Sequence, residues 1–175
     1  GLSHAEKVIG IHSTSVARPT PYMGPGSQEL SEAEKDFLQQ RRDWQAAEGG
    51  YAHIQGTKPQ TLSYGLNDSP AGLAAWIVEK YRTWSDCGGD VEKSYTKDEL
   101  LTIVTIYWVT QTISSSTRMY YENQKAVWTM NRDEKVAAPA GMAMFPQEIS
   151  KPPREWGERS YDVRRWTEMA NGGHF

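Results

Sequence analysis

The sequence predicts an α/β protein in which a sheet formed by both ends of the chain is interrupted by a long helical insertion. Two observations predict this fold class. Apolar, strand-like runs occur near residues 7–13, 135–145 and 166–170, whereas helix-capping signals gather between residues 31 and 123. The order strand, helical block, strand, strand is typical of a sheet with helices inserted over it.

The first expected strand covers residues 7–13, and a loop is expected after it. The run Lys-Val-Ile-Gly-Ile-His-Ser shows no alternation of apolar and polar residues, a pattern typical of strands covered on both faces in parallel sheets. Residues 17–27 contain three prolines and two glycines, so we expect no regular element there.

The helical insertion begins with a capping box. Ser31 and Glu34 fit the S-x-x-E pattern, in which each side chain accepts a hydrogen bond from the other residue's backbone N–H. Gly49-Gly50 ends the pattern, which predicts a helix over residues 32–48.

Two further helices are expected in the insertion. Ser69 followed by Pro70 is a helix start, and apolar residues recur after it at helical spacing. Thr96 and Glu99 form a second capping box. The segment that follows is rich in β-branched residues, but its length, up to Asn123, favours a helix over a strand.

The remaining strands are expected near the C-terminus. Residues 135–145 follow a polar turn and have strand-like composition, and residues 166–170 do so again. Pro152-Pro153 excludes a regular element that would run across it.

Composition and motifs exclude several classes of function. Nineteen basic and 22 acidic residues leave a formal charge of −3, and no basic run could follow a nucleic-acid backbone. The longest apolar stretch, Leu100–Val109, falls short of the roughly 20 residues that span a bilayer. The single cysteine, Cys87, allows neither an internal disulfide nor a zinc cluster. We therefore predict no nucleic-acid partner, no membrane segment, no metal site and no cofactor.

Histidine is scarce, and His174 has the most suggestive setting. It follows two glycines directly after a predicted strand, and the carboxyl ends of strands are where α/β folds bind ligands. A neutral imidazole there can accept a proton near pH 7. The alternative is an ordinary loop histidine at the surface. His4, His12 and His53 are expected to be structural.

Glu148 is a candidate partner for that imidazole, because it also follows a predicted strand. A carboxylate beside an imidazole fixes its tautomer and stabilises the imidazolium. By composition alone Asp133, Glu134 and Glu155 are equally eligible. No nucleophile or nucleotide motif is present, since G-x-S-x-G, G-x-x-x-x-G-K-[ST] and G-x-G-x-x-G are all absent. Seven tryptophans and nine tyrosines could line an apolar pocket.

Five segments stand out when they are taken together and in order. They are Gly50–Thr61 (GYAHIQGTKPQT), Leu66–Lys80 (LNDSPAGLAAWIVEK), Arg118–Asn123 (RMYYEN), Phe145–Glu148 (FPQE) and Gly172–Phe175 (GGHF). In sequence and spacing this set resembles the microsomal-type epoxide hydrolases of the α/β-hydrolase superfamily.

The resemblance implies an α/β-hydrolase sheet, of which only the later strands lie in this chain, with an inserted and mainly helical cap. Residues 1–25 and 124–175 would belong to the sheet domain, and residues 26–123 would form the cap. The implied partners are a small apolar epoxide and water, and a homo-oligomer is compatible with the sequence. A cytoplasmic location is favoured, with membrane attachment through a segment outside this chain left open.

The resemblance also implies the roles of four residues. In this family an aspartate attacks an epoxide carbon, and a histidine with a carboxylate partner then activates water to hydrolyse the resulting ester. His174 matches the base and Glu148 its acidic partner. Tyr51 and Tyr120 match the two cap tyrosines that donate hydrogen bonds to the epoxide oxygen, and Tyr120 rather than its neighbour Tyr121 matches the family's position.

Parts of the family pattern do not occur in this sequence. The nucleophilic aspartate and its oxyanion-hole loop would precede residue 1, and the last helix of the sheet domain would follow residue 175. We therefore expect the chain to be a partial epoxide hydrolase that is inactive alone. Two alternatives stay open: a haloalkane dehalogenase, favoured by the many tryptophans, and a binding protein of the same fold that has lost its chemistry.

Overall fold

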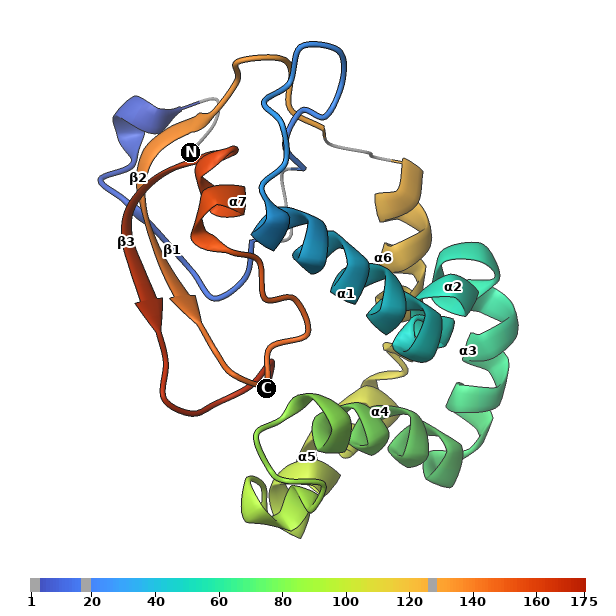
Figure 1. Ribbon diagram of the computed structural model, residues 1–175. Coiled ribbons are helices and arrows are strands. Elements are labelled where there is room, and N and C mark those ends of the chain that lie inside the picture. Colours follow the sequence, from blue (N-terminus) through green and yellow to red (C-terminus); the bar gives the residue numbers. More distant parts are fainter. Residues whose placement is uncertain (1–3, 17–19, 126–128) are drawn as a thin grey trace. The chain divides into compact units, whose positions relative to one another are not determined.

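The computed structural model describes residues 4–16, 20–125 and 129–175, which form two compact units (Figure 1). The sheet unit contains the described residues up to Trp44 and from Thr129 to His174. The helical unit contains residues 45–125 and Phe175.

The sheet unit contains three parallel strands in the order β1-β2-β3 (Figure 1). Their bounds are β1 Ile11–Ser13, β2 Val136–Met144 and β3 Tyr161–Glu168. Ala140 at the centre of β2 lies opposite Ile11 on one side and Val163 on the other. A 3₁₀ turn, η1 Ala5–Lys7, precedes β1, and the short helix α7 Arg154–Glu158 precedes β3.

The first strand is shorter than the predicted residues 7–13. Lys7 and Val8 donate their backbone N–H groups to His4 and Ala5 in a local turn, so these donors are not available to a sheet ladder. Ile9 is 103% exposed, so the expected cover on both faces is wrong for this part of the chain. The second strand is confirmed, and the third begins earlier than predicted, at Tyr161.

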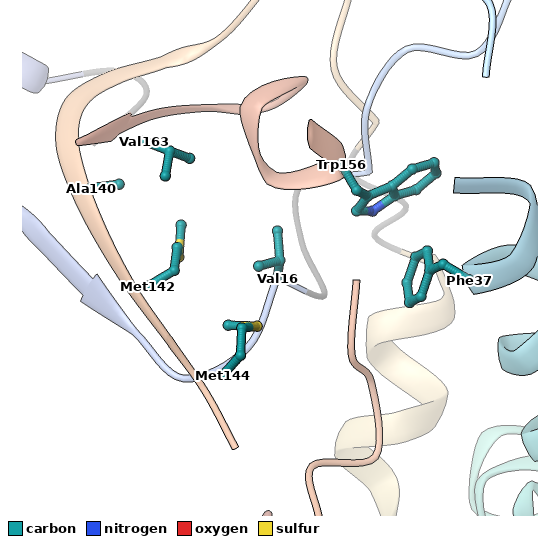
Figure 2. Close-up of a cluster of buried hydrophobic side chains, with 7 residues drawn as sticks. All are labelled: Val16, Phe37, Ala140, Met142, Met144, Trp156 and Val163. Atoms are coloured by element: carbon teal, nitrogen blue, oxygen red, sulfur yellow. The ribbon is translucent and has the colours of Figure 1, made fainter. Parts of the chain in front are cut away.

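One face of the sheet packs against two helices. The buried side chains that form this cluster are Val16, Phe37, Ala140, Met142, Met144, Trp156 and Val163 (Figure 2). Phe37 belongs to α1 Glu32–Glu48, and its ring lies 5.4 Å from that of Trp156 on α7. The first half of α1 is therefore part of the core of the sheet unit.

The start of α1 is fixed as the sequence predicts. Ser31 and Glu34 make both hydrogen bonds of the capping box, at 3.0 and 3.2 Å. Glu34 also accepts hydrogen bonds from the guanidinium of Arg159 at 2.5 and 2.7 Å, and its side chain is only 2% exposed. No regular element occurs in residues 20–27, in agreement with the predicted loop, whereas residues 17–19 lie outside the described residues.

In the described part of the chain, the helical unit consists of the end of α1, five further helices and one 3₁₀ turn. The further elements are α2 Gly50–Thr57, α3 Pro59–Asp68, α4 Pro70–Trp84, η2 Val91–Lys93, α5 Lys97–Thr110 and α6 Ile113–Lys125. Helices α2 and α3 pack against α6, and α4 packs against α5. Leu66, Leu73, Val104 and Ile113 form the buried core between them.

The capping signals mark the helix starts correctly, but one predicted helix is divided. Ser69 accepts a hydrogen bond from Gly72 N–H at the start of α4, and Thr96 and Glu99 form a complete capping box at the start of α5. The single helix expected up to Asn123 is interrupted at Gln111, whose φ of 53° is left-handed and ends α5. In the described residues no helix combines the length and the apolar character needed to cross a membrane.

Candidate active site

The carboxyl ends of β2 and β3 bring two loops together in the sheet unit. Because β2 and β3 are parallel neighbours, the segments that follow them leave the sheet at the same edge. Met169 donates its backbone N–H to Met144 O at 2.8 Å, and Gln147 donates to Gly172 O at 3.1 Å. The loop after β3 therefore runs beside the loop after β2.

These two loops hold His174 beside Glu148. His174 Nδ1 is 2.7 Å from Glu148 Oε1, and this oxygen also accepts the backbone N–H of Ile149 at 2.8 Å. The Glu148 side chain is 2% exposed, whereas the His174 side chain is 34% exposed. A buried carboxylate thus orients an imidazole that still reaches solvent. With Nδ1 directed at the carboxylate, proton transfer falls to Nε2.

Gly172 is needed for this arrangement. Its φ is +108°, a conformation that favours glycine, and a Cβ added there would lie 2.5 Å from the ring of Phe145. The close approach lets the loop after β3 lie against the loop after β2, two residues before His174. The first of the two glycines before His174 is therefore required by the backbone conformation and by the close contact with Phe145.

The other three candidate carboxylate partners of His174 lie elsewhere and have other contacts. Asp133 is in a turn with its side chain 92% exposed. Glu134 accepts the backbone N–H of Asn131 at 2.8 Å, and Glu155 accepts the hydroxyl of Ser31 at 2.5 Å. Among the four candidates, Glu148 is the one that the structure brings to His174.

The two candidate tyrosines meet in the helical unit. Tyr51 lies on α2 and Tyr120 on α6, and their rings are 5.8 Å apart in an edge-to-face arrangement. Burial raises the pKa of Tyr51, and charge and hydrogen-bond interaction with Tyr120 raise that pKa further. The Tyr51 phenol is therefore protonated at neutral pH and can act as a hydrogen-bond donor.

Tyr121 has a different environment from Tyr120. It lines a groove of about 660 Å³ on the helical unit, together with residues such as Thr57, Tyr64 and Arg118. Tyr120 faces Tyr51 instead. Within the helical unit, the two adjacent tyrosines therefore have different neighbours.

The remaining histidines take no part in these groups. His4 lies 3.6 Å from Glu6, His12 is exposed on β1, and His53 is exposed on α2. Among the residues that the structure describes, no group of three or more histidine, cysteine, aspartate or glutamate side chains could hold a metal ion.

Sequence reasoning assigned no role to two residues of α4 that contact Tyr51. The ring of Trp84 is 5.1 Å from that of Tyr51, and the Lys80 ammonium lies 5.0 Å from the Tyr51 ring centroid. Their spacing of four residues places both on one face of a helix, and this is the signal that could have found them.

The chain is similar to epoxide hydrolases in sequence and in structure. Epoxide hydrolase 1 of Sus scrofa is 44% identical over 137 residues, which are 73% of this chain and 30% of that protein. Juvenile hormone epoxide hydrolase 1 of Ctenocephalides felis is 39% identical over 137 residues, again 73% of this chain and 30% of that protein. The solved structure of Aspergillus niger epoxide hydrolase matches with a TM-score of 0.72 and 28% identity, over 95% of this chain and 41% of that one. No protein-family profile matches the chain. The chain spans about a third of the length of the curated relatives it matches.

Proposed function

Because this chain belongs with the epoxide hydrolases of the α/β-hydrolase fold in sequence and structure, we propose that the complete protein containing it hydrolyses epoxides to vicinal diols. The observation that carries the proposal is the pair of His174 and buried Glu148 at the carboxyl edge of the parallel sheet, with 2.7 Å between Nδ1 and Oε1. We infer that residues 26–123 act as the cap, of which residues 26–44 pack with the sheet unit, and that residues 1–25 and 124–175 act as part of the sheet domain.

The first step opens the ring. A carboxylate oxygen of an aspartate outside this sequence attacks one epoxide carbon, the bond from that carbon to the ring oxygen breaks, and a hydroxyalkyl ester forms. The leaving oxygen gains negative charge as the bond breaks. Tyr51 and Tyr120 donate hydrogen bonds to it, and one of them supplies the proton. Donors placed where charge develops lower the barrier most when bulk water is excluded.

The second step hydrolyses the ester. His174 Nε2 takes a proton from water, and the resulting hydroxide attacks the ester carbonyl. The diol leaves, the aspartate carboxylate is restored, and the proton on His174 returns by way of solvent to the tyrosine that gave up its proton in the first step. Glu148 holds the imidazole in the required tautomer and stabilises the imidazolium that forms, because its oxygen is fixed by His174 and by the Ile149 N–H. Division of one displacement into two steps is the general advantage of covalent catalysis.

The tyrosine pair favours this function over a haloalkane dehalogenase, because two phenol groups are suited to an oxygen that becomes an alkoxide. We infer that the substrate is a small and apolar epoxide. The binding-protein alternative predicts that the complete protein binds such an epoxide without consuming it, and measurement of diol formation separates these outcomes.

The test uses single-turnover kinetics of the complete protein with an aryl epoxide. In the Glu148→Gln and His174→Ala variants we expect ester hydrolysis to slow by about 10²-fold or more, the usual contribution of general base catalysis. Ring opening should continue, so that an adduct with the mass of the epoxide accumulates. Asp133→Asn is the matched control, since that carboxylate is 92% exposed, and it should behave as wild type. Wild-type rates of ester hydrolysis in either variant would remove that residue from its proposed role.

A further inference from the structure

The ammonium group of Lys80 lies beside two packed aromatic rings of the helical unit. Its Nζ is 5.0 Å from the ring centroid of Tyr51 and 5.1 Å from that of Trp84. The two rings are themselves 5.1 Å apart. Because Lys80 and Trp84 are four residues apart on α4, both reach Tyr51 from one helix face.

Two carboxylates hold this ammonium in place. Glu79 Oε2 is 2.7 Å from Lys80 Nζ, and Glu48 Oε2 is 3.9 Å from it. Burial raises the pKa of Glu79, but hydrogen bonds from Lys80 and Thr83 outweigh this and the pKa is lowered overall. The Lys80 side chain is only 18% exposed, whereas that of Glu79 is 50% exposed. The position of the Lys80 ammonium is thus restrained, and the side chains of its two carboxylate partners are more exposed to solvent than its own.

We propose that Lys80 is a positioning residue that orients and polarises Tyr51 for ring opening, an inference that rests on the proposed function. A cation over an aromatic face attracts the π electrons of the ring. When the Tyr51 hydroxyl donates to the epoxide oxygen, negative charge builds up on the phenol, and the nearby ammonium stabilises that charge. Burial opposes such a charge, which is why a compensating cation matters at this ring.

The effect belongs to one of the two chemical steps. Ring opening uses the phenol of Tyr51, whereas ester hydrolysis uses His174 and Glu148. Removal of the Lys80 charge should therefore slow the first step and leave the second unchanged. A residue that only maintained the fold would affect both steps.

The chain offers a matched control on the neighbouring tyrosine. Lys125 Nζ lies 4.0 Å from the ring centroid of Tyr121, and the Lys125 side chain is 58% exposed. This pair has the same chemistry as Lys80 with Tyr51, but its tyrosine has no part in the proposed reaction.

The experiment measures the rate constants of ring opening and of ester hydrolysis in the complete protein with an aryl epoxide. We expect Lys80→Met to slow ring opening about tenfold, equal to about 1.4 kcal/mol, a value within the range of partly desolvated cation–π contacts. Lys80→Arg should stay within about threefold of wild type, because guanidinium groups also bind aromatic faces. Lys125→Met should react as wild type does.

A double-mutant cycle with Tyr51→Phe isolates the phenol. In that background Lys80→Met should change ring opening by less than about twofold, since no hydroxyl remains to be polarised. The inference is overturned if Lys80→Met and Lys125→Met open the ring at the same rate, or if Lys80→Met slows both steps equally. It is also overturned if Lys80→Arg opens the ring as slowly as Lys80→Met, or if Lys80→Met still slows ring opening in the Tyr51→Phe background. A wild-type protein that forms no adduct and no diol refutes the proposed function and this inference with it. Normal wild-type turnover with unaffected Lys80 variants refutes this inference alone.

Discussion

The position of His174 depends on a residue without a side chain. Gly172 combines a φ of +108° with close approach to the ring of Phe145, and it precedes the imidazole by two residues. The backbone bond from Gln147 N–H to Gly172 O then holds the two loops together at 3.1 Å. A change of one atom at Gly172 therefore acts on the geometry between His174 and Glu148.

We expect Gly172→Ala to lower both activity and stability. The strained φ and the overlap of the new methyl group with Phe145 should cost about 1–3 kcal/mol in the free energy of unfolding. Displacement of the base by about 1 Å should reduce the rate of diol formation about 10²-fold.

The control for this prediction is Gly65→Ala in α3. A Cβ at Gly65 meets no atom within 4 Å, so alanine there should stabilise the helix by about 0.5–1 kcal/mol and leave activity unchanged. Urea unfolding and diol formation are the two measurements. Equal stability of Gly172→Ala and wild type would contradict the role assigned to Gly172.

Helix α1 is attached to the sheet unit by both polar and apolar contacts on one face. Glu34 pairs with Arg159, and Phe37, three residues further on, packs against Trp156. Arg159 also donates to the backbone carbonyls of Gln28 and Glu29 at 3.0 and 2.8 Å. The loop before the helix and the helix start are thus fixed by one guanidinium.

The Glu34–Arg159 pair makes stability depend on pH in the acid range. The hydrogen bond from Arg159 lowers the pKa of Glu34 below 4.5, although burial opposes this and the Ser31 N–H supports it. A lowered folded-state pKa means that the contribution of Glu34 is complete above pH 4.5 and is lost as the pH falls through the folded-state value.

We predict that Glu34→Gln destabilises the protein by about 3 kcal/mol at pH 7, because it leaves a buried guanidinium without its carboxylate. The difference from wild type should shrink as the pH falls below 4.5, as measured by urea unfolding over a pH series. Glu158→Gln removes an exposed partner of Arg154, 45% exposed, and should cost less than about 1 kcal/mol at every pH. If Glu34→Gln lowered the free energy of unfolding by the same amount at every pH, the charge of the carboxylate would not be the cause of the stabilisation.

Over the whole molecule, the proposed chemistry needs groups from both units and one group from outside this sequence. His174 and Glu148 lie in the sheet unit, and Tyr51 and Tyr120 lie in the helical unit. The proposed nucleophile is an aspartate that the family resemblance places outside the 175 residues. In the proposed mechanism, the covalent route therefore needs the complete protein.

We predict that the 175-residue chain, purified alone, forms no diol and no covalent adduct with an aryl epoxide. The complete protein should form both under the same conditions, as chromatography and mass spectrometry can show. Turnover by the isolated chain would mean that another group in this sequence can attack the epoxide, and the assignment of an external aspartate would then be wrong.

The starts of α1, α4 and α5 and the central strand could be predicted because their signals are local, whereas α2, α3 and α7 were not predicted. Ser31 with Glu34 and Thr96 with Glu99 satisfy backbone donors within one turn, so the capping boxes mark helix starts without tertiary information. The left-handed turn at Gln111 was missed because glutamine carries no preference for that conformation. The extent of the first strand was missed because its length depends on which residues find a partner in β2.

The residues of the candidate site were predicted from the order of the family's motifs along the chain. The contacts between these residues could not be predicted in the same way. By composition, Glu148 was no better a candidate for the partner of His174 than Asp133, Glu134 or Glu155. Only the family resemblance favoured Glu148. The structure separates them because the parallel pairing of β2 and β3 brings the loops after both strands to one sheet edge.

By itself the sequence determined the starts of α1, α4 and α5 and the absence of a long basic or membrane-spanning run, since these depend on neighbours within a few residues, whereas the four candidate side chains came from the family resemblance. Only the tertiary structure decided that Glu148 contacts His174, that Tyr51 packs against Tyr120, and that Lys80 lies over Tyr51. Those contacts join residues 26, 69 and 29 positions apart, and their distances are set by strand register and helix packing, which no local pattern encodes.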